Sequence, residues 1–331
     1  MRIAINGMGR IGRAALKIIL DTDGMEVIAV NDIISIENLA YMIKYDTVYG
    51  IYEREVSLDG QTLIVDGIRI SYSSIKKPEE LPWKDNDIDL VIESTGLFTM
   101  GEDAEKHIKA GAKTVVISAP TKSEHTPTVV YGVNSVDGKV SVFSCASCTT
   151  NNISPIVEIL DRRIGIKKAI MTTVHAYTAS QSIVDGPSKK NFRMGRAGAA
   201  NLVPTTTGAA IATTKALPSL VGKFDGVAIR TPIPVGSISD LTFVTKKLVS
   251  TEEINSIFQE EAKTDRYAKV LTVTNEPLVS SDIIKSPFAS TVDLNMTRVV
   301  GGDLLKVMAW YDNEWGFTHQ MIRQILEIKG S

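Results

Sequence analysis

The 331-residue sequence is poor in cysteine and in net charge, and it contains no long apolar run. Two cysteines are too few for a disulfide scaffold. A net charge of −2 lacks the basic excess that is typical of nucleic-acid-binding proteins. No apolar stretch approaches the roughly 18 residues that span a bilayer, and the first residues lack the apolar core of a signal peptide. We therefore expect a cytoplasmic protein without a membrane or nucleic-acid partner.

The first half of the chain alternates short apolar runs with amphipathic stretches, which is typical of a parallel sheet covered by helices on both faces. The length suffices for two domains, and 44% of the residues are apolar. An antiparallel hairpin region with two Asp-Gly turns is expected between Tyr49 and Tyr72. The other expected elements of this half are strands at 2–6, 27–31, 90–93 and 114–118, and helices at 11–20, 36–43 and 103–110.

The second half has longer alternating strands and one long polar loop, from Ser180 to Gly208. A loop of this length inside a compact domain is usually functional. The sequence therefore predicts an α/β domain with a parallel sheet at 1–148 and an α+β catalytic domain with a mixed or antiparallel sheet at 149–312. A C-terminal helix at about 313–331 is expected to pack back onto the first domain. The other expected elements are strands at 169–176, 227–230, 238–245 and 299–310, and helices at 152–163, 207–217, 251–262 and 318–328.

One cysteine has an unusually polar sequence context. Cys148 is flanked by hydroxyl and amide side chains in the run 146–152, whereas a structural cysteine usually packs as a small hydrophobic residue. The helix expected at 152–163 would place Cys148 near a helix N-terminus, where the positive end of the dipole favours a thiolate. Cys148 is therefore a candidate nucleophile.

Cys145 precedes Cys148 by three residues, and the pair could be taken for a redox or zinc motif. The redox motif belongs to a thioredoxin-like context that this sequence does not show. Zinc would need further cysteines or suitably spaced histidines. We expect no metal site.

A base for Cys148 must come from four histidines. His107 lies in a charged helical run and is predicted to be at the surface, and His125 and His319 have no distinctive context. His175 lies in a strand that runs out into the long polar loop, so it is the best candidate to accept and return a proton. A structural histidine with satisfied hydrogen bonds is the alternative interpretation of His175.

A Gly-x-Gly-x-x-Gly motif at 7–12 directly follows the first expected strand and opens the first helix. Glycines at this spacing suit a tight turn and the close approach of a pyrophosphate to a helix N-terminus, as in a Rossmann-type doubly wound sheet. Asp32, after the second strand, suits the ribose hydroxyls and would repel a 2′-phosphate, which favours NAD over NADP. A turn or N-cap role is the alternative for Asp32. The candidate cofactor-binding residues are Gly7, Gly9, Arg10, Ile11, Gly12, Asp32, Ser94, Thr95, Gly96 and Ser118.

Cationic and hydroxyl side chains suited to phosphate follow His175 along the chain. Residues 205–208 (Thr-Thr-Thr-Gly) open a predicted helix, and Arg230 ends a strand. Lys189 and Lys190 are interpreted as solvated loop residues at a subunit contact. The further candidates for an anion site are Thr178, Arg193 and Arg196.

Together these motifs resemble the phosphorylating glyceraldehyde-3-phosphate dehydrogenase family, along essentially the whole chain. The number and order of the matching stretches carry the resemblance. They are residues 5–13, 30–32, 39–41, 44–46, 93–96, 118–120, 146–151, 185–187, 204–210 and 310–316.

The resemblance implies an activity: NAD-dependent oxidation of D-glyceraldehyde 3-phosphate to 1,3-bisphosphoglycerate in glycolysis or gluconeogenesis. Cys148 would attack the aldehyde, and His175 would keep the thiol ionised and take the hydroxyl proton. Hydride transfer to NAD would leave a thioacyl enzyme, which inorganic phosphate would resolve.

The resemblance also assigns binding residues. The family's substrate-phosphate site corresponds to Thr178 and Arg230, and Asn313 corresponds to the residue that fixes the nicotinamide carboxamide. Pro187 matches the pattern that prefers NAD. The S-shaped loop at about 178–200 implies a homotetramer. The attacking-phosphate site corresponds to Ser147, Thr149, Thr207 and Gly208.

Two alternatives stay open from the sequence. An erythrose-4-phosphate dehydrogenase shares the cysteine and histidine but passes the thioester to water, whereas Arg230 and the helix start at 205–208 favour phosphate as acceptor. A non-catalytic NAD-binding protein of the same fold would have no physical need for the pair of Cys148 and His175. Cys145, Met194 and Phe317 depart from residues that are common in the family.

Overall fold

The computed structural model describes residues 1–136, 140–188 and 191–330, and its contacts divide the chain into two compact units. The first unit comprises Met1–Val129, Ser135–Ala146 and the chain from Met321 onward, and the second comprises Val130–Asn134 and Ser147–Gln320. The sequence predicts a domain boundary after residue 148, whereas the contacts place it after Ala146. The reason is that Cys148 is the first residue of a helix that packs inside the second unit.

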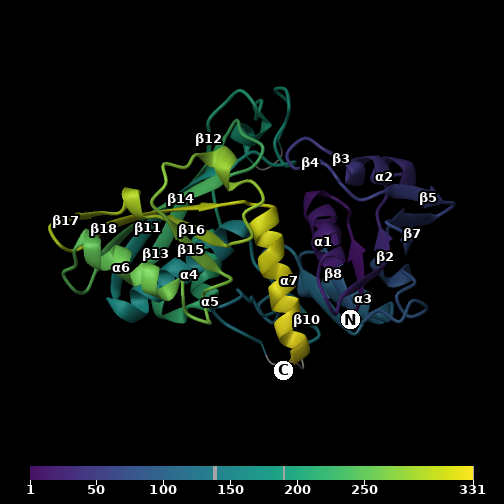
Figure 1. Cartoon of the computed structure of the whole chain (residues 1–331), viewed down its shortest axis with the longest axis horizontal. Coiled ribbons are helices and arrows are strands. Elements are labelled where there is room, and N and C mark those ends of the chain that lie inside the picture. The colour runs from purple at the N-terminus through teal and green to yellow at the C-terminus, as the bar shows by residue number, and fades with distance from the viewer. Residues whose placement is uncertain (137–139, 189–190, 331) are drawn as a thin grey trace. The chain divides into compact units, whose positions relative to one another are not determined.

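The first unit is built on a sheet that is parallel in its larger part and antiparallel at one edge (Figure 1). Its strands are β1 (Arg2–Asn6), β2 (Glu26–Asn31), β5 (Val56–Asp59), β6 (Thr62–Val65), β7 (Ile68–Ser73), β8 (Leu90–Glu93), β9 (Thr114–Ile117) and β10 (Val142–Ser144). The order is β10-β9-β8-β1-β2-β7-β6-β5, with antiparallel pairing of β7, β6 and β5. The helices are α1 (Arg10–Leu20), α2 (Ile36–Lys44) and α3 (Gly101–Lys109), and a small separate hairpin is formed by β3 (Tyr45–Asp46) and β4 (Gly50–Ile51).

The parallel strands are buried on both faces, which accounts for their continuous apolar character. One face packs against α3, through a cluster that contains Ala4, Val91, Ala104 and Val115. The strand register aligns Asn6 of β1 with Asn31 of β2 and with Glu93 of β8. The loops that follow these strands therefore start at the same edge of the sheet, where an open α/β sheet binds its ligand. This architecture confirms the predicted Rossmann-type sheet.

The second unit contains a mixed sheet, with helices packed on one of its faces (Figure 1). Its strands are β11 (Ile166–Ala176), β12 (Val203–Thr206), β13 (Phe224–Thr231), β14 (Ser237–Thr245), β15 (Leu271–Thr274), β16 (Ser290–Asp293), β17 (Arg298–Val300) and β18 (Leu304–Tyr311). The order is β12-β13-β11-β14-β18-β16-β15, and β17 pairs with β18. Strands β11 and β13 run parallel, and β14 and β18 run antiparallel to their neighbours. The helices are α4 (Cys148–Arg163), α5 (Ala209–Ala216) and α6 (Thr251–Glu261), followed by α7 (Trp315–Gly330), which enters the first unit at Met321.

Helix α4 forms the centre of the second unit. Its residues from Thr149 to Leu160 are all buried, and its apolar side chains join a cluster that includes Met171 of β11 and Leu241 of β14. A helix buried along this length cannot shift without disrupting the core. The first turn of α4 therefore occupies a fixed position, and Cys148 with it.

Several predicted elements have different bounds in the structure. The strand expected at 299–310 is a hairpin of β17 and β18, because Gly301 and Gly302 adopt positive φ angles of 61° and 82° and turn the chain. The loop expected at 180–208 contains a short 3₁₀ helix, Phe192–Gly195, and ends in strand β12. Strands β10, β15 and β16 were not expected, since each has only three or four residues. Within the described residues, no helix is long and apolar enough to cross a membrane.

Candidate active site

The loop after β1 is held by contacts that require glycine. Gly7 has a φ of 93°, and a Cβ atom built on it would lie 2.5 Å from the backbone nitrogen of Thr95. A Cβ atom on Gly12 would lie 2.0 Å from the carbonyl oxygen of Gly7. At Gly9, no atom of the described residues lies within 4 Å of the added carbon. The first and third glycines thus form the turn, and the second leaves open space at the start of α1 for a ligand.

Asp32 has two tasks at the end of β2. Its Oδ2 accepts a hydrogen bond of 2.6 Å from the backbone nitrogen of Met8, and its Oδ1 accepts one of 3.2 Å from Ile34. The carboxylate therefore holds the glycine loop, in addition to lining the adjacent cavity. The remaining lone pairs suit ribose hydroxyls. Asp32 therefore has the turn role that was the alternative interpretation, and it also lines the cavity.

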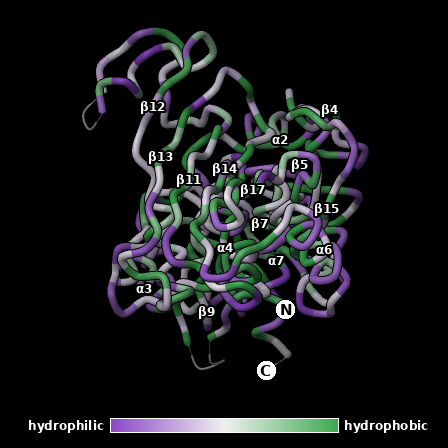
Figure 2. The backbone as a smooth tube through the Cα atoms, turned by 90° about the vertical axis from the view of Figure 1, so that its left-hand side faces the viewer, coloured by the Kyte–Doolittle hydropathy of each residue, from purple (hydrophilic) through white to green (hydrophobic). Residues whose placement is uncertain are grey.

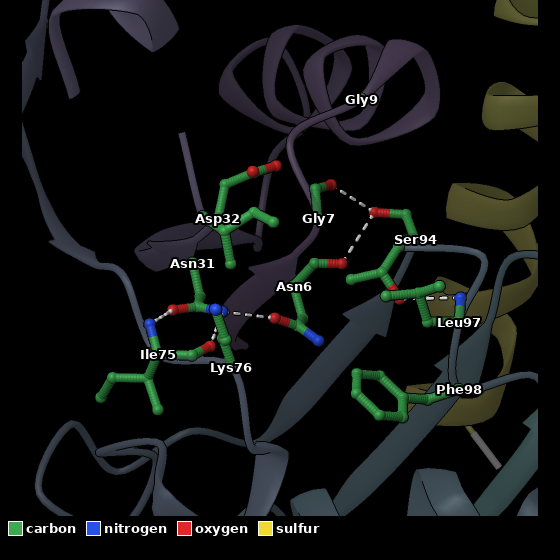
Figure 3. A pocket seen from close by; sticks show the side chains of 12 residues that line it. Asn6, Gly7, Gly9, Asn31, Asp32, Ile75, Lys76, Ser94, Leu97 and Phe98 are labelled. Carbon is green, nitrogen blue, oxygen red and sulfur yellow. Dashed lines mark hydrogen bonds between the residues drawn. The ribbon is translucent and has the colours of Figure 1, made fainter. Parts of the chain in front are cut away.

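A cavity of about 390 Å³ lies at this edge of the sheet (Figure 3). Gly7 lies between Asp32 on one side and Ser94 on the other, and the Ser94 hydroxyl donates to the carbonyl oxygens of Gly7 (2.7 Å) and Asn6 (3.1 Å). The size, the open helix N-terminus and the carboxylate fit a dinucleotide. The lining residues are Asn6, Gly7, Gly9, Asn31, Asp32, Ile33, Ile75, Lys76, Ser94, Thr95, Leu97 and Phe98.

Of the ten cofactor residues predicted between positions 7 and 118, five line this cavity and five do not. Arg10 forms an ion pair of 2.5 Å with Asp46 and lies over the ring of Tyr49, so its charge is already engaged. Ser118 extends the pairing of β8 and β9 by donating its backbone N–H to Glu93. The residues outside the lining are Arg10, Ile11, Gly12, Gly96 and Ser118.

Three cavity residues that follow β7 and β8, namely Lys76, Leu97 and Phe98, were not predicted from the sequence. Lys76 comes from the segment after the antiparallel insert, and Leu97 and Phe98 follow Gly96. Leu97 and Phe98 could have been predicted, because their loop follows a parallel strand. Lys76 could not, since the fold of the insert decides where the chain returns to the sheet.

His107 is buried, although the sequence predicts a surface position. The indole nitrogen of Trp83 donates to its Nδ1 at 2.9 Å, and its Nε2 lies 3.0 Å from Oε2 of Glu93. Because the indole can only donate, Nδ1 accepts and Nε2 carries the proton toward Glu93. Asn6 donates to the same oxygen at 2.6 Å. The prediction was wrong because the charged neighbours of His107 mark the opposite side of α3.

In the second unit, helix α4 begins at Cys148, four residues earlier than predicted. Ser147 is its N-cap, and the serine Oγ accepts a hydrogen bond of 3.0 Å from the backbone nitrogen of Thr150. A serine cap satisfies one of the free N–H groups of the first turn and defines where the helix starts. Cys148 therefore lies in the first helical turn, as expected from its proximity to a helix N-terminus.

His175 lies beside Cys148, as the sequence predicts. The Sγ of Cys148 is 3.4 Å from Nε2 of the imidazole. The other ring nitrogen, Nδ1, lies 2.7 Å from the carbonyl oxygen of Ala176 and 2.6 Å from Nη1 of Arg230. The imidazole is buried, and the ring of Tyr311 contacts it edge-on. A thiol and an imidazole at this distance form the pair that nucleophilic catalysis by cysteine requires.

The electrostatic setting of the pair differs from the predicted stabilised thiolate. Desolvation raises the pKa of the Cys148 thiol, and the charge of Arg230 and the hydrogen bond from Thr149 offset this rise only in part. Burial, reinforced by Arg230, lowers the pKa of His175 to about 3. Both shifts favour a neutral thiol beside a neutral imidazole. Desolvation therefore opposes the thiolate that the helix dipole was expected to stabilise.

Cys145 belongs to the first unit and is buried there. Its Sγ donates to the carbonyl oxygen of Ile117 at 3.3 Å, and burial raises the pKa of its thiol to about 12. A buried thiol of this kind is inert and packs as a small hydrophobic group. The nucleophile suggested by the geometry is therefore Cys148.

Tyr311 connects the first turn of α4 with β11. Its hydroxyl lies 2.9 Å from Oγ1 of Thr149 and 2.8 Å from Oγ1 of Thr173, and burial raises its pKa. The three hydroxyls form one buried chain that fixes the orientation of Thr149. No local sequence pattern indicates this role, since Tyr311 stood out only as part of a matched stretch.

The predicted anion-binding residues do not all meet at one place. Thr149 and Arg230 are linked to Cys148 and His175 by the contacts described above. Thr207 accepts from the backbone nitrogen of Ala209 at 3.2 Å, at the start of α5, and open space surrounds Gly208, the N-cap of that helix. Thr207 thus contributes to an accessible helix N-terminus.

Two other predicted residues are engaged in the long loop. Arg196 forms an exposed ion pair of 2.8 Å with Asp185. The hydroxyl of Thr178 lies 2.8 Å from Oγ of Ser180, beside a cavity of about 560 Å³ within the loop. Pro187 is exposed in the same loop. Arg193 donates toward the carbonyl oxygen of Pro204, and Lys189 and Lys190 lie outside the described residues.

Asn313 is held in a defined orientation after β18. Its Oδ1 accepts hydrogen bonds from the backbone nitrogen of Gly236 (3.2 Å) and the hydroxyl of Ser237 (2.9 Å). Its Nδ2 has no hydrogen-bond partner in the part of the chain that the structure describes. The amide can therefore donate to a carbonyl oxygen, as its predicted role toward a carboxamide requires.

Comparison with known proteins identifies both halves of the chain. Residues 1–101 match the family model described as the NAD binding domain of glyceraldehyde 3-phosphate dehydrogenase, and residues 147–313 match the C-terminal domain of the same enzyme. The chain is 44% identical over 326 residues to glyceraldehyde-3-phosphate dehydrogenase 2 of Streptomyces avermitilis, which covers 97% of this chain and 96% of that protein.

Other relatives show similar likeness. Glyceraldehyde-3-phosphate dehydrogenase of Clostridium acetobutylicum is 43% identical over 330 residues, which are 98% of this chain and 97% of that protein. Glyceraldehyde-3-phosphate dehydrogenase 2 of Bacillus subtilis is 43% identical over 331 residues, 99% of this chain and 96% of that protein. The match extends over both units, and it agrees with a nucleotide-binding sheet joined to a cysteine–histidine domain. The chain therefore belongs to the glyceraldehyde-3-phosphate dehydrogenase family of NAD-dependent enzymes.

Proposed function

We propose that this chain oxidises glyceraldehyde 3-phosphate with NAD and inorganic phosphate, through a thioacyl intermediate on Cys148. The observation that carries the proposal is the 3.4 Å approach of Cys148 Sγ to His175 Nε2, in the first turn of α4 and beside Arg230. A thiol, a base and a cation in one place suit attack on an aldehyde that bears a negative charge.

The cofactor would bind in the cavity of the first unit. The open space at Gly9 and the N-terminus of α1 would receive the pyrophosphate, and Asp32 would accept hydrogen bonds from the adenosine ribose. The carboxylate of Asp32 supports NAD over NADP. Asn313, with its Nδ2 available, would hold the nicotinamide carboxamide. When bound, NAD supplies the hydride acceptor for the oxidation.

In the first half of the reaction, Sγ of Cys148 forms a bond to the aldehyde carbon, and the thiol proton moves to Nε2 of His175. His175 returns this proton to the substrate oxygen, which gives a hemithioacetal. His175 then removes the hydroxyl proton as the hydride leaves the carbon, and a thioester on Cys148 remains. Each proton transfer uses the same nitrogen, which the geometry places next to Sγ.

In the second half, a phosphate oxygen attacks the thioester carbonyl. The carbon–sulfur bond breaks, its electron pair returns to Sγ, and His175 delivers the proton that restores the thiol. The released product is an acyl phosphate. The hydroxyl of Thr149, the capping residue Ser147 and the helix N-terminus at Thr207 and Gly208 are the groups that we assign to the attacking phosphate.

The substrate phosphate is assigned to Arg230 and Thr178. Arg230 forms no ion pair with a carboxylate of the described residues, so its charge is available to an anionic substrate. Arg196 is a weaker candidate, because it is paired with Asp185.

The assay that tests the proposal compares glyceraldehyde 3-phosphate with erythrose 4-phosphate, each with and without inorganic phosphate. We expect NADH formation with the three-carbon aldehyde that depends on phosphate or on arsenate, its reactive analogue. Phosphate-independent turnover that is fastest with the four-carbon sugar would instead indicate an erythrose-4-phosphate dehydrogenase. NAD binding without turnover of either aldehyde would indicate a non-catalytic protein.

We also propose that the chain forms a homotetramer. The loop before β12, which extends beyond the ends of β12 and β13 (Figure 2), exposes the apolar side chains of Ile183, Val184, Phe192 and Leu202. Ile170 and Val227 are exposed on strands β11 and β13 of the same unit. Exposed large apolar side chains of this kind support a protein–protein contact on this unit. Sedimentation velocity should give a mass near four chains, and a stable monomer would refute this proposal.

A further inference from the structure

The side-chain amide of Asn313 is held by two consecutive residues, Gly236 and Ser237. Its Oδ1 accepts one hydrogen bond from the backbone nitrogen of Gly236 at 3.2 Å and a second from the hydroxyl of Ser237 at 2.9 Å. We call these two donors the Gly-Ser clamp. Both donors contact the oxygen end of the amide, so the nitrogen end, Nδ2, is left to interact with a ligand.

The position of the Gly-Ser clamp follows from the sheet and from one turn. The antiparallel register of β14 and β18 pairs Ser237 with Tyr311, so the start of β14 lies beside the chain that leaves β18 toward Asn313. Gly236 has a φ of 93°, and a Cβ atom built on it would lie 2.2 Å from the carbonyl oxygen of Ser280. Only glycine fits this turn, and the turn fixes the direction of the N–H that Asn313 receives.

The hydroxyl of Ser237 is itself fixed by a second hydrogen bond. The side chain is fully buried, and its Oγ accepts from the backbone nitrogen of Ala176 at 3.1 Å. Because a backbone N–H can only donate, the hydroxyl hydrogen remains available for Oδ1 of Asn313. Ala176 directly follows His175 in β11, and its carbonyl oxygen lies 2.7 Å from Nδ1 of that imidazole. Ser237 therefore connects the strand that carries His175 with the amide of Asn313.

The Gly-Ser clamp removes the freedom that the Asn313 side chain would otherwise keep. The backbone at this point is already fixed, because Oδ1 of Asp312 accepts from the backbone nitrogens of Glu314 (2.9 Å) and Trp315 (2.8 Å) at the start of α7. Rotation of the amide remains. The reversed amide would place its NH₂ group against the N–H of Gly236, so that two donors face each other. The clamp therefore selects the orientation in which Nδ2 points away from it.

We propose that the Gly-Ser clamp presents Nδ2 of Asn313 to the carbonyl oxygen of a ligand, and that Ser237 is thereby a positioning residue for the nicotinamide end of the cofactor. The proposal rests on the function proposed above, which assigns Asn313 to the nicotinamide carboxamide. A donor that is already oriented loses little rotamer freedom when the ligand binds, so the clamp strengthens binding at this end alone. ADP-ribose, which has the adenosine and the pyrophosphate but no nicotinamide, does not use it.

The test compares the binding of NAD and of ADP-ribose to the full-length protein and to Ser237→Ala, by isothermal titration calorimetry without aldehyde. We expect the variant to bind NAD roughly three- to tenfold more weakly, the effect of one lost hydrogen bond, and ADP-ribose within about twofold of the wild type. Unchanged NAD affinity, or an equal loss for both ligands, would overturn the proposal. Ser237→Cys puts a weak S–H donor in place of the hydroxyl, and it should show the same selective loss if alanine disturbs folding.

Ser239→Ala is the matched control. Ser239 lies two residues further along β14 and is also fully buried, but its Oγ has no hydrogen-bond partner among the described residues. Its removal takes a buried hydroxyl from the same strand and leaves the Gly-Ser clamp intact. We expect both ligands to bind this variant as they bind the wild type. A selective loss of NAD affinity as large as that of Ser237→Ala would indicate a general loosening of β14 and contradict the proposal.

The double variant Ser237→Ala/Asn313→Ala shows whether Ser237 acts through Asn313. Without the amide the clamp has nothing to orient, so adding Ser237→Ala to Asn313→Ala should change the NAD affinity by no more than about twofold. Losses that multiply would show that Ser237 acts by another route, and unchanged NAD affinity of Asn313→Ala would remove the premise, so either result refutes the proposal.

The binding experiments need no turnover, so they separate this proposal from the proposed function. A selective loss of NAD affinity in Ser237→Ala, in a protein that shows no dehydrogenase activity with either aldehyde, would refute the proposed function and support the clamp. Phosphate-dependent dehydrogenase activity without a selective loss would support the function and refute the clamp.

Discussion

At the scale of single residues, environment rather than identity separates the two cysteines. Cys145 and Cys148 lie within one short stretch, yet Cys145 donates to a backbone carbonyl in the core of the first unit, and Cys148 faces the imidazole of His175. Desolvation raises both thiol pKa values. What distinguishes Cys148 is a proton acceptor at 3.4 Å and a nearby cation, and these are the features that make a thiol usable in catalysis.

Serine substitutions at the two positions should therefore have opposite profiles. Cys148→Ser should lower kcat by on the order of 10³ or more, since the weaker nucleophile cannot form the thioester, and should leave NAD affinity within about twofold. Cys145→Ser keeps the hydrogen bond to Ile117 and should retain most of the activity, at a cost of about 1 kcal/mol in stability. Steady-state kinetics, NAD titration by fluorescence and urea unfolding give the three readouts. Normal turnover of Cys148→Ser, or loss of activity in Cys145→Ser alone, would indicate that Cys145 and not Cys148 is the nucleophile.

At the scale of elements, periodicity located most helices and strands, and packing decided the exceptions. The first strands, α1 and the antiparallel insert were predictable because their apolar patterns are regular. The start of α4 was placed too late, because Thr149, Thr150 and Asn151 are poor helix formers whose burial outweighs their propensity. The burial of His107 depends on Trp83 and Glu93 from other segments, which no local pattern reveals.

The glycine loop provides a test at this scale, because an added side chain would clash with the backbone at Gly12 but not at Gly9. Gly12→Ala should destabilise the protein by several kcal/mol, since the added carbon would lie 2.0 Å from the carbonyl oxygen of Gly7. Gly9→Ala meets open space in the free chain and should leave its thermal unfolding midpoint nearly unchanged, while weakening NAD binding by tenfold or more. Differential scanning fluorimetry with and without NAD separates the effects. Equal loss of stability in both variants would show that Gly9 serves the fold and not the ligand.

At the scale of the whole molecule, the chain contains two units of different architecture, each with its own task. The parallel sheet of the first forms a cavity where the ends of β1, β2 and β8 are in register. The mixed sheet of the second aligns His175 with Arg230 and supports the helix that carries Cys148. In that second unit the imidazole of His175 is buried in its neutral form, so folding at acid pH includes the free-energy cost of removing its proton.

This cost predicts how stability depends on pH. His175 has a pKa of about 3 in the folded protein and about 6.5 in the unfolded chain, so between these values the unfolded state binds a proton that the native state does not. The free energy of unfolding should therefore fall as the pH drops below 6.5, by up to about 1.4 kcal/mol per pH unit from this group.

His175→Asn is the control, because it removes the titrating group and keeps a polar side chain. In phosphate-free buffer, its stability relative to the wild type should improve by about 2 kcal/mol when the pH is lowered from 7 to 5, as judged by urea unfolding. The carboxylates with lowered pKa values, such as Asp46 and Glu261, also lose stabilising charge in acid, but they do so at lower pH and equally in both proteins. A difference in stability that is constant with pH would show that His175 is accessible to protons in the native state.

The sequence by itself determined the chemistry that this protein has available. The glycine spacing, the acidic residue after the second strand, the polar context of Cys148 and the strand position of His175 were all readable, because each is a local pattern with a local physical cause. Only the tertiary structure decided which groups meet. His175, Arg230, Tyr311 and Cys148 come from four elements, and their contacts depend on strand register and on the burial of α4. The protonation state of the site was likewise not readable, because desolvation is a property of the assembled core and not of any segment.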